Sequence, residues 1–113
     1  MKWEEIELLV KSVDSWTSLG SLVFISAFTT EDPSYEISVK KFRKIGKNSF
    51  ENDEGAVHTY LEENEILSLF KNYSVLYHQE GMGPEHHHGY RPSHRHAMTE
   101  VVFKKKDRGE YIV

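Results

Sequence analysis

The first part of the chain shows apolar residues at helical spacing. Between Trp3 and Leu19 they recur every three to four positions, and acidic and other polar residues lie between them. This spacing predicts an amphipathic helix with one buried stripe. Gly20 is expected to act as its C-terminal cap, because glycine adopts the left-handed conformation at the lowest cost. The stripe consists of Ile6, Leu9, Val10, Val13 and Trp16.

A short apolar run follows. The sequence LVFISAF, residues 22–28, has no alternation and is rich in β-branched and aromatic residues. It predicts a strand that is buried on both faces, as in parallel sheets. The next stretch, TTEDPSYE at 29–36, is turn-rich, and Pro33 forces Asp32 out of the helical region. This turn lies at the end of the predicted strand, where open α/β sheets usually place ligands.

The second half of the chain predicts one more helix and two more strands. Residues 62–73 form the helix, with acidic residues in its first turns. Residues 74–80 form a strand with Val75 and Tyr77 on one face, and residues 97–105 form another. The expected core positions are Ile66, Leu67, Leu69 and Phe70 on the helix and Ala97, Thr99, Val101 and Phe103 on the last strand.

The pattern over residues 37–57 allows several structures. Basic residues surround a few apolar ones, which is compatible with an edge strand, a short hairpin or an ordered flap. Such a charge run is typical of a solvated face rather than of a phosphate site.

Composition narrows the class of protein. With 113 residues, 38% of them hydrophobic, the chain fits a single domain over residues 1–113. The formal charge of -4 disfavours a nucleic-acid partner, and the absence of cysteine excludes disulfides and thiolate zinc sites. No signal peptide and no apolar run of membrane-spanning length is evident, so we expect a cytoplasmic protein without a membrane partner.

Several stretches resemble the C-terminal half of class I, Rossmann-like S-adenosylmethionine-dependent methyltransferases. GSLVFISAFTTEDPSY is similar to their fifth strand and the loop after it, and VHTYLEENEILSLFKNYSVLYHQE to their last helix and sixth strand. SHRHAMTEVVFKKK resembles their closing strand. The resemblance implies an α/β fold with a three-stranded sheet ordered 5-7-6, in which the last strand is antiparallel and two helices cover one face.

The same resemblance shows what this sequence lacks. Members of that family bind the cofactor with a glycine-rich turn after the first strand and an acidic residue after the second. This chain has neither, since its only G-x-G, at Gly81 and Gly83, precedes Pro84 and a histidine run rather than a helix. We therefore expect the isolated chain to hold no cofactor, and to use S-adenosylmethionine only if a partner completes the site.

The stretch from Gly81 to Met98 contains five of the seven histidines. His86 with His88, or His94 with His96, would share one side of an extended chain, a geometry that permits chelation. Zinc sites without cysteine are uncommon, however, and no carboxylate is tied to the cluster by a known motif. These four histidines are candidate metal ligands, and adventitious nickel or zinc binding is the alternative.

Three further residues are site candidates. The resemblance implies that His58 lies near a substrate pocket, where an imidazole acts as a base or orients a nucleophile. The alternative is a partly buried histidine that holds a loop to the last helix. Tyr35 and Tyr60 are substrate-facing candidates, with a packing role as the alternative.

Three hypotheses for function follow. The first is a methyltransferase-like half-domain that is not catalytic alone and acts as a self-associating or partner-completing module. The second is one subunit of a split or dimer-assembled methyltransferase for a small molecule, completed by an N-terminal half. The third is a histidine-rich metal-binding protein. Because the expected sheet would expose an apolar face, we also expect a homodimer, with exchanged elements as a further option.

Overall fold

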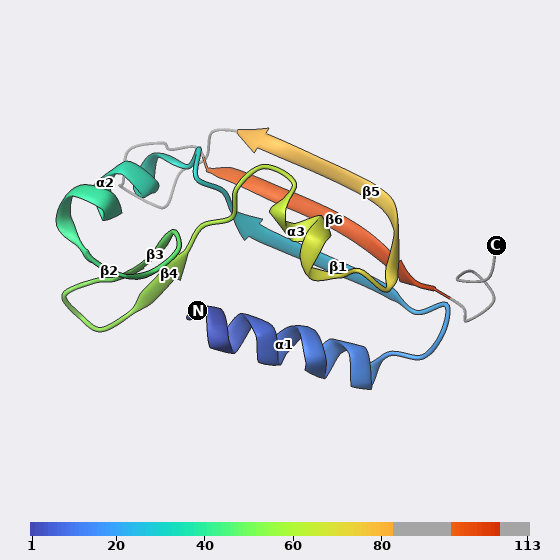
Figure 1. The fold of residues 1–113 in the computed structure, drawn as a ribbon. Coiled ribbons are helices and arrows are strands. Elements are labelled where there is room, and N and C mark those ends of the chain that lie inside the picture. Colours follow the sequence, from blue (N-terminus) through green and yellow to red (C-terminus); the bar gives the residue numbers. More distant parts are fainter. Residues whose placement is uncertain (83–95, 107–113) are drawn as a thin grey trace, which may run out of the picture.

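The computed structural model describes residues 1–82 and 96–106 and contains two small sheets and, within these residues, three helices (Figure 1). Both sheets are three-stranded and antiparallel, with orders β1-β6-β5 and β2-β3-β4. The α/β class expected from the sequence is confirmed. The elements are α1 (Trp3–Trp16), β1 (Leu22–Phe28), α2 (Pro33–Lys41), β2 (Arg43–Gly46), β3 (Ser49–Glu51), β4 (Val57–Thr59), α3 (Glu65–Leu69), β5 (Tyr73–Met82) and β6 (Ala97–Lys105).

The larger sheet has its last strand in the middle. β6 pairs with β1 on one side and with β5 on the other, and both pairings are antiparallel. The assignment of this sheet to a Rossmann-like fold with strand order 5-7-6 stays a prediction.

Strict alternation along β6 defines two faces of this sheet. Ala97, Thr99, Val101 and Phe103 have no exposed surface, as predicted, and we call their side the covered face. The intervening residues of β6 point to the other side, which we call the open face. The open face carries Leu22, Phe24, Ser26 and Phe28 of β1, Tyr77 of β5, and Met98, Glu100 and Val102 of β6.

The core lies on the covered face. Ile66 of α3 and Phe70 just after it are buried there, and the ring of Phe70 lies 5.1 Å from that of Phe103. Val10 and Val13 of α1 pack against the same core while remaining partly exposed. Both of the helices predicted from the sequence therefore cover the same face.

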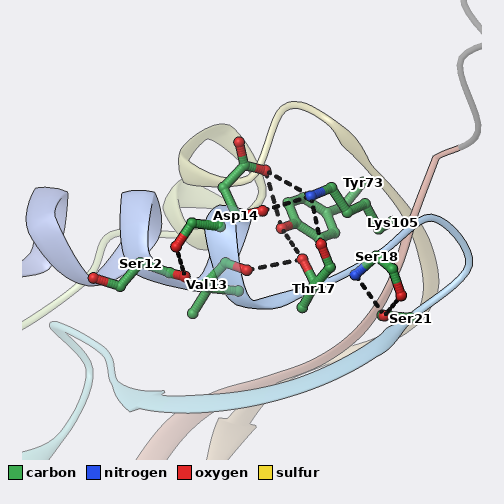
Figure 2. Close-up of polar contacts among 9 residues, drawn as sticks. Ser12, Val13, Asp14, Thr17, Ser18, Ser21, Tyr73 and Lys105 are labelled. Carbon is green, nitrogen blue, oxygen red and sulfur yellow. Dashed lines mark hydrogen bonds and ion pairs between the residues drawn. The ribbon is translucent and has the colours of Figure 1, made fainter.

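Polar contacts fix the end of α1 to the larger sheet (Figure 2). The Lys105 ammonium donates to the carbonyl oxygens of Asp14 at 2.5 Å and Thr17 at 3.0 Å. The Tyr73 hydroxyl lies 3.2 Å from both the Asp14 carboxylate and the Thr17 hydroxyl. These contacts join the last turn of α1 to the first residue of β5 and the last of β6.

α1 is shorter than predicted. It ends at Trp16, and Thr17 is the C-cap. Gly20 has a φ of +85°, but it lies in the turn that follows and does not cap the helix. Trp16 and Leu9, placed in the buried stripe by their spacing, are 74% and 41% exposed, and Val10 and Val13 are the members of the stripe that pack against the core together with Trp3.

β1 is not buried on both faces. Leu22 and Phe24 are 66% and 64% exposed, while the alternate residues Val23, Ile25 and Ala27 pack against the core. β1 pairs with β6 in antiparallel orientation. The apolar run predicts burial of the side chains on both faces of β1. Within the described residues, other elements cover only one of these faces.

β5 departs from the predicted alternation. Its register shifts between Val75, which is opposite Phe103, and Tyr77, which is opposite Val102. Val75 and Tyr77 therefore face residues on different sides of β6 instead of sharing one face. A β-bulge inserts one unpaired residue, here Leu76, and the pattern of apolar and polar residues does not indicate its position.

The region that the sequence left unassigned forms a helix and the second sheet. α2 begins at Pro33, inside the predicted turn, with Asp32 as an N-cap in extended conformation. The hairpin alternative is confirmed for β2 and β3, and β4 adds a third strand. The basic residues of this segment are mostly exposed, and Lys47 forms ion pairs with Glu62 and Glu65.

Among the described residues, no helix combines the length and the apolar character needed to span a membrane.

The buried ring of Phe103 should dominate the stability of the fold. Phe103→Ala is expected to lower the free energy of unfolding by about 3–5 kcal/mol, because it removes a buried ring and leaves a cavity between Phe70 and Tyr73. Urea denaturation followed by circular dichroism measures this. Leu8→Ala on α1, where Leu8 is 63% exposed, is the control and should change stability by about 0.5 kcal/mol or less. Equal effects of the two substitutions would contradict this placement of the core.

Candidate functional site

A buried polar cluster lies where β1 ends and β6 begins. Its centre is Asp32, which is 2% exposed. One carboxylate oxygen accepts hydrogen bonds from the Ala97 amide at 2.9 Å and the His96 Nδ1 at 3.1 Å. The other accepts from the Ser34 amide at 3.1 Å and from the Ser34 hydroxyl. Asp32 thus joins the start of β6 to the first turn of α2.

The local sequence explains why Asp32 occupies this position. An aspartate before a proline is kept in extended conformation, and Pro33 is suited to the first helical position. The Asp32 side chain is then free to cap α2 through the Ser34 amide. The Asp32-Pro33 dipeptide predicts a turn, but an N-cap residue followed by proline is also a helix-start signal.

Hydrogen bonds set the charge state of Asp32. Burial acts to raise the pKa of its carboxyl group, but hydrogen bonds from the Ser34 hydroxyl, the Ala97 and Ser34 amides and His96 together lower the pKa below its usual 3.8. The carboxylate is therefore ionised at neutral pH. A buried carboxylate that orients an imidazole is compatible with general-base chemistry, and it is equally suited to holding two elements together.

Tyr35 and Tyr60 lie beside this cluster. Tyr60 is 3% exposed, and its hydroxyl is 2.9 Å from the Ser34 hydroxyl. The Tyr35 hydroxyl donates to Asn48 at 2.8 Å, and the two tyrosine rings lie 5.3 Å apart in an edge-on arrangement. Both hydroxyls thus bond to the protein itself, which supports the packing alternative more directly than substrate contact.

His58 lies elsewhere. It is an exposed residue of β4, opposite Phe50 of β3. It lines an apolar cleft of 520 Å³ between α1, α3 and β1, whose lining includes neither Tyr35 nor Tyr60. The structure therefore brings Tyr35 and Tyr60 together and places His58 at a separate site.

The four candidate metal ligands are divided between described and undescribed residues. His86, His88 and His94 lie outside the described residues. His96 bonds to Asp32, and its ring lies 5.1 Å from that of Phe28. In residues 1–82 and 96–106, no group of three or more potential ligand side chains is positioned to hold a metal ion.

The open face of the larger sheet is a further feature that the candidate residues do not explain. It exposes Leu22, Phe24 and Tyr77, which are 66%, 64% and 46% exposed, and Phe28 at 36%. Exposed apolar side chains on neighbouring strands are typical of interaction sites in soluble proteins, and here the polar row of Ser26, Glu100 and Gln79 separates Phe28 from the others.

Neither a protein-family model nor a curated protein matches the chain. The site must therefore be interpreted from its chemistry.

The bonds to Asp32 should make stability depend on pH. Because its pKa is lower in the folded than in the unfolded chain, Asp32 stabilises the fold above pH 3.8, and this contribution is lost as the pH falls through the folded pKa. Asp32→Asn should thus lower the free energy of unfolding by about 1.5–3 kcal/mol at pH 7. In urea denaturation at successive pH values, the difference from wild type should shrink below pH 3.8.

The matched control is Glu31→Gln, which removes the adjacent exposed carboxylate. It should change stability by about 0.5 kcal/mol or less at every pH. A pH-independent difference between wild type and Asp32→Asn would show that the charge of Asp32 does not contribute.

Proposed function

We propose that this chain is an association module that resembles the C-terminal half of a class I methyltransferase and is not catalytic alone. It self-associates or is completed by a partner chain. The observation that carries the proposal is the open face of the larger sheet, where Phe24 and Leu22 remain mostly exposed.

The open face has the physical properties of an interface. Complete burial of a leucine or phenylalanine side chain contributes about 1.5–3 kcal/mol, and several such side chains lie on one flat surface. Two sheets pack face to face through this kind of surface. A two-fold axis lets a second copy present the same residues, which makes a homodimer the simplest association.

The proposed resemblance to a methyltransferase rests on a correspondence between the strands of this sheet and those of that family. It takes β1, β5 and β6 as counterparts of the fifth, sixth and seventh strands of that family. The support is the central, antiparallel position of β6 and the packing of α1 and α3 on one face. In such a fold, elements outside this sequence would cover the open face.

A second candidate is a subunit of a split methyltransferase. What favours it is His58, which lines an apolar cleft beside β1, an arrangement compatible with a substrate pocket. S-adenosylmethionine would then depend on a partner for the glycine-rich turn and the acidic residue.

The association can be tested by sedimentation equilibrium. We expect a dimer at micromolar concentration and a monomer for Phe24→Lys, with dimerisation weakened about 100-fold or more because two phenylalanines leave the interface. Leu8→Lys is the matched control, since Leu8 on α1 is 63% exposed and Phe24 is 64% exposed. A wild-type monomer, or equal effects of both lysines, would overturn the open-face interface.

Binding of S-adenosylmethionine separates the module from the enzyme. Calorimetric titration of the isolated chain should give no heat of binding, because the family's hydrogen bonds to charged groups, each worth about 1.5–3 kcal/mol, have no counterpart here. A micromolar dissociation constant would instead support the enzyme. In that case His58→Ala would be the first variant to measure. His58→Gln, at the same exposed position, is the conservative comparison.

A further inference from the structure

The apolar cleft lies along one edge of β1. Figure 1 shows β6 on one side of β1 and α1 beyond the other. The cleft of 520 Å³ is lined by residues of β1 from both faces of the sheet, which indicates that it follows the edge and not one face alone. Its other walls come from Met1, Ile6, Leu9, Val10 and Val13, from Val57, His58, Thr59 and Leu61, and from Ile66, Leu69 and Phe70.

The backbone of β1 directs hydrogen-bonding groups into this edge. The Ser21 carbonyl and the Thr29 amide bond to β6, at 2.9 and 3.0 Å. Because successive residues of a strand point their backbone groups to opposite sides, Phe24 and Ser26 direct theirs away from β6. Within the described residues, no hydrogen bond to these outward groups is present.

One residue already pairs with this edge. The Leu61 amide donates to the Phe28 carbonyl at 3.0 Å, and the Leu61 carbonyl accepts from the Thr30 amide at 3.1 Å. This parallel bridge occupies the end of the edge and shows that a chain can lie beside β1 there. The edge from Leu22 to Ser26 lies before the bridge.

The chemistry of the cleft defines what fits. None of the described residues lining it has a carboxylate, lysine or arginine side chain. A free edge in a soluble protein is usually protected by charge or proline, and β1 has neither. The complement is an extended, uncharged segment that exchanges backbone hydrogen bonds and carries apolar side chains on both faces.

We infer that the edge of β1 is a strand-addition site for such a segment from a partner chain. The inference rests on the proposed function, for which it specifies the partner. A second folded copy is a poorer occupant, because its own β1 would bring its α1 into the cleft that α1 already bounds. A strand presented without a helix on that side has no such conflict.

A synthetic peptide tests the site. It carries residues 20–29 of this chain, an uncharged apolar strand, followed by a short lysine tail for solubility. On binding, hydrogen exchange of the Phe24 and Ser26 amides, measured by nuclear magnetic resonance, should slow about tenfold or more. A peptide with proline at alternate positions, which cannot pair as a strand, should leave the exchange unchanged.

A matched pair of variants distinguishes backbone pairing of the peptide with β1 from non-specific apolar contact. Ser26→Pro removes an outward amide that makes no bond to β6, and it should weaken peptide binding about tenfold or more. Ser26→Ala keeps the amide and should bind as wild type does. If Ser26→Pro does not fold, the exchange data on wild type decide the question.

The outcomes distinguish this inference from the open-face interface. A dimer in sedimentation without slowed exchange at Phe24 and Ser26 would overturn strand addition and leave the proposed function standing. Slowed exchange in a monomeric chain would support strand addition and refute the open-face dimer. Peptide binding that Ser26→Pro does not weaken would also overturn it, because contact would then lie on the open face.

Discussion

The burial of Val101 and Phe103 at the centre of the larger sheet is the interaction on which the fold depends. Both side chains are completely covered, and the elements around them reach the same point from distant parts of the sequence. Because side chains of a strand alternate between faces, fixing these residues inward fixes Val102 and its neighbours outward. One packing event thus creates both the core and the open face.

The helices follow from that core in different ways. α3 is short, yet it places Ile66 in a fully buried position. α1 is long and buries no residue completely, so it relies on partly buried Val10 and Val13 and on the polar contacts of Lys105 and Tyr73 at its last turn. Because α1 is only partly packed onto the sheet, an apolar cleft remains between α1 and β1, and His58 of β4 contributes to its lining.

The sequence predicted those features that depend on local alternation or spacing. The inward residues of β6 and the apolar residues around Ile66 were identified because each pattern has one period and one buried side. The bulge at Leu76 and the exposure of Trp16 were not predictable, since both depend on contacts with other elements that the local pattern does not contain. The sequence left the second sheet as one of several alternatives, because its strands are three or four residues long, too short to display a period.

The candidate site shows a similar division. The sequence placed Asp32 in an extended conformation, but it could not show that His96 and Ala97, more than sixty residues away, would donate to the same carboxylate. His96 was considered only with the neighbouring histidines, because spacing along the chain was the only available criterion. Its contact with a buried carboxylate depends on the pairing of β1 with β6, which no local pattern specifies.

Within the described residues, two surfaces without a partner, the open face and the free edge, meet on β1. Its open face requires apolar contact, which is non-directional and tolerates several arrangements of a partner. Its free edge requires backbone pairing, which is directional and fixes register. Covering the face leaves the Phe24 and Ser26 amides without partners, and pairing the edge leaves the Phe24 side chain exposed. β1 is therefore completed better by two associations than by one: the first covers its open face, and the second pairs with its free edge.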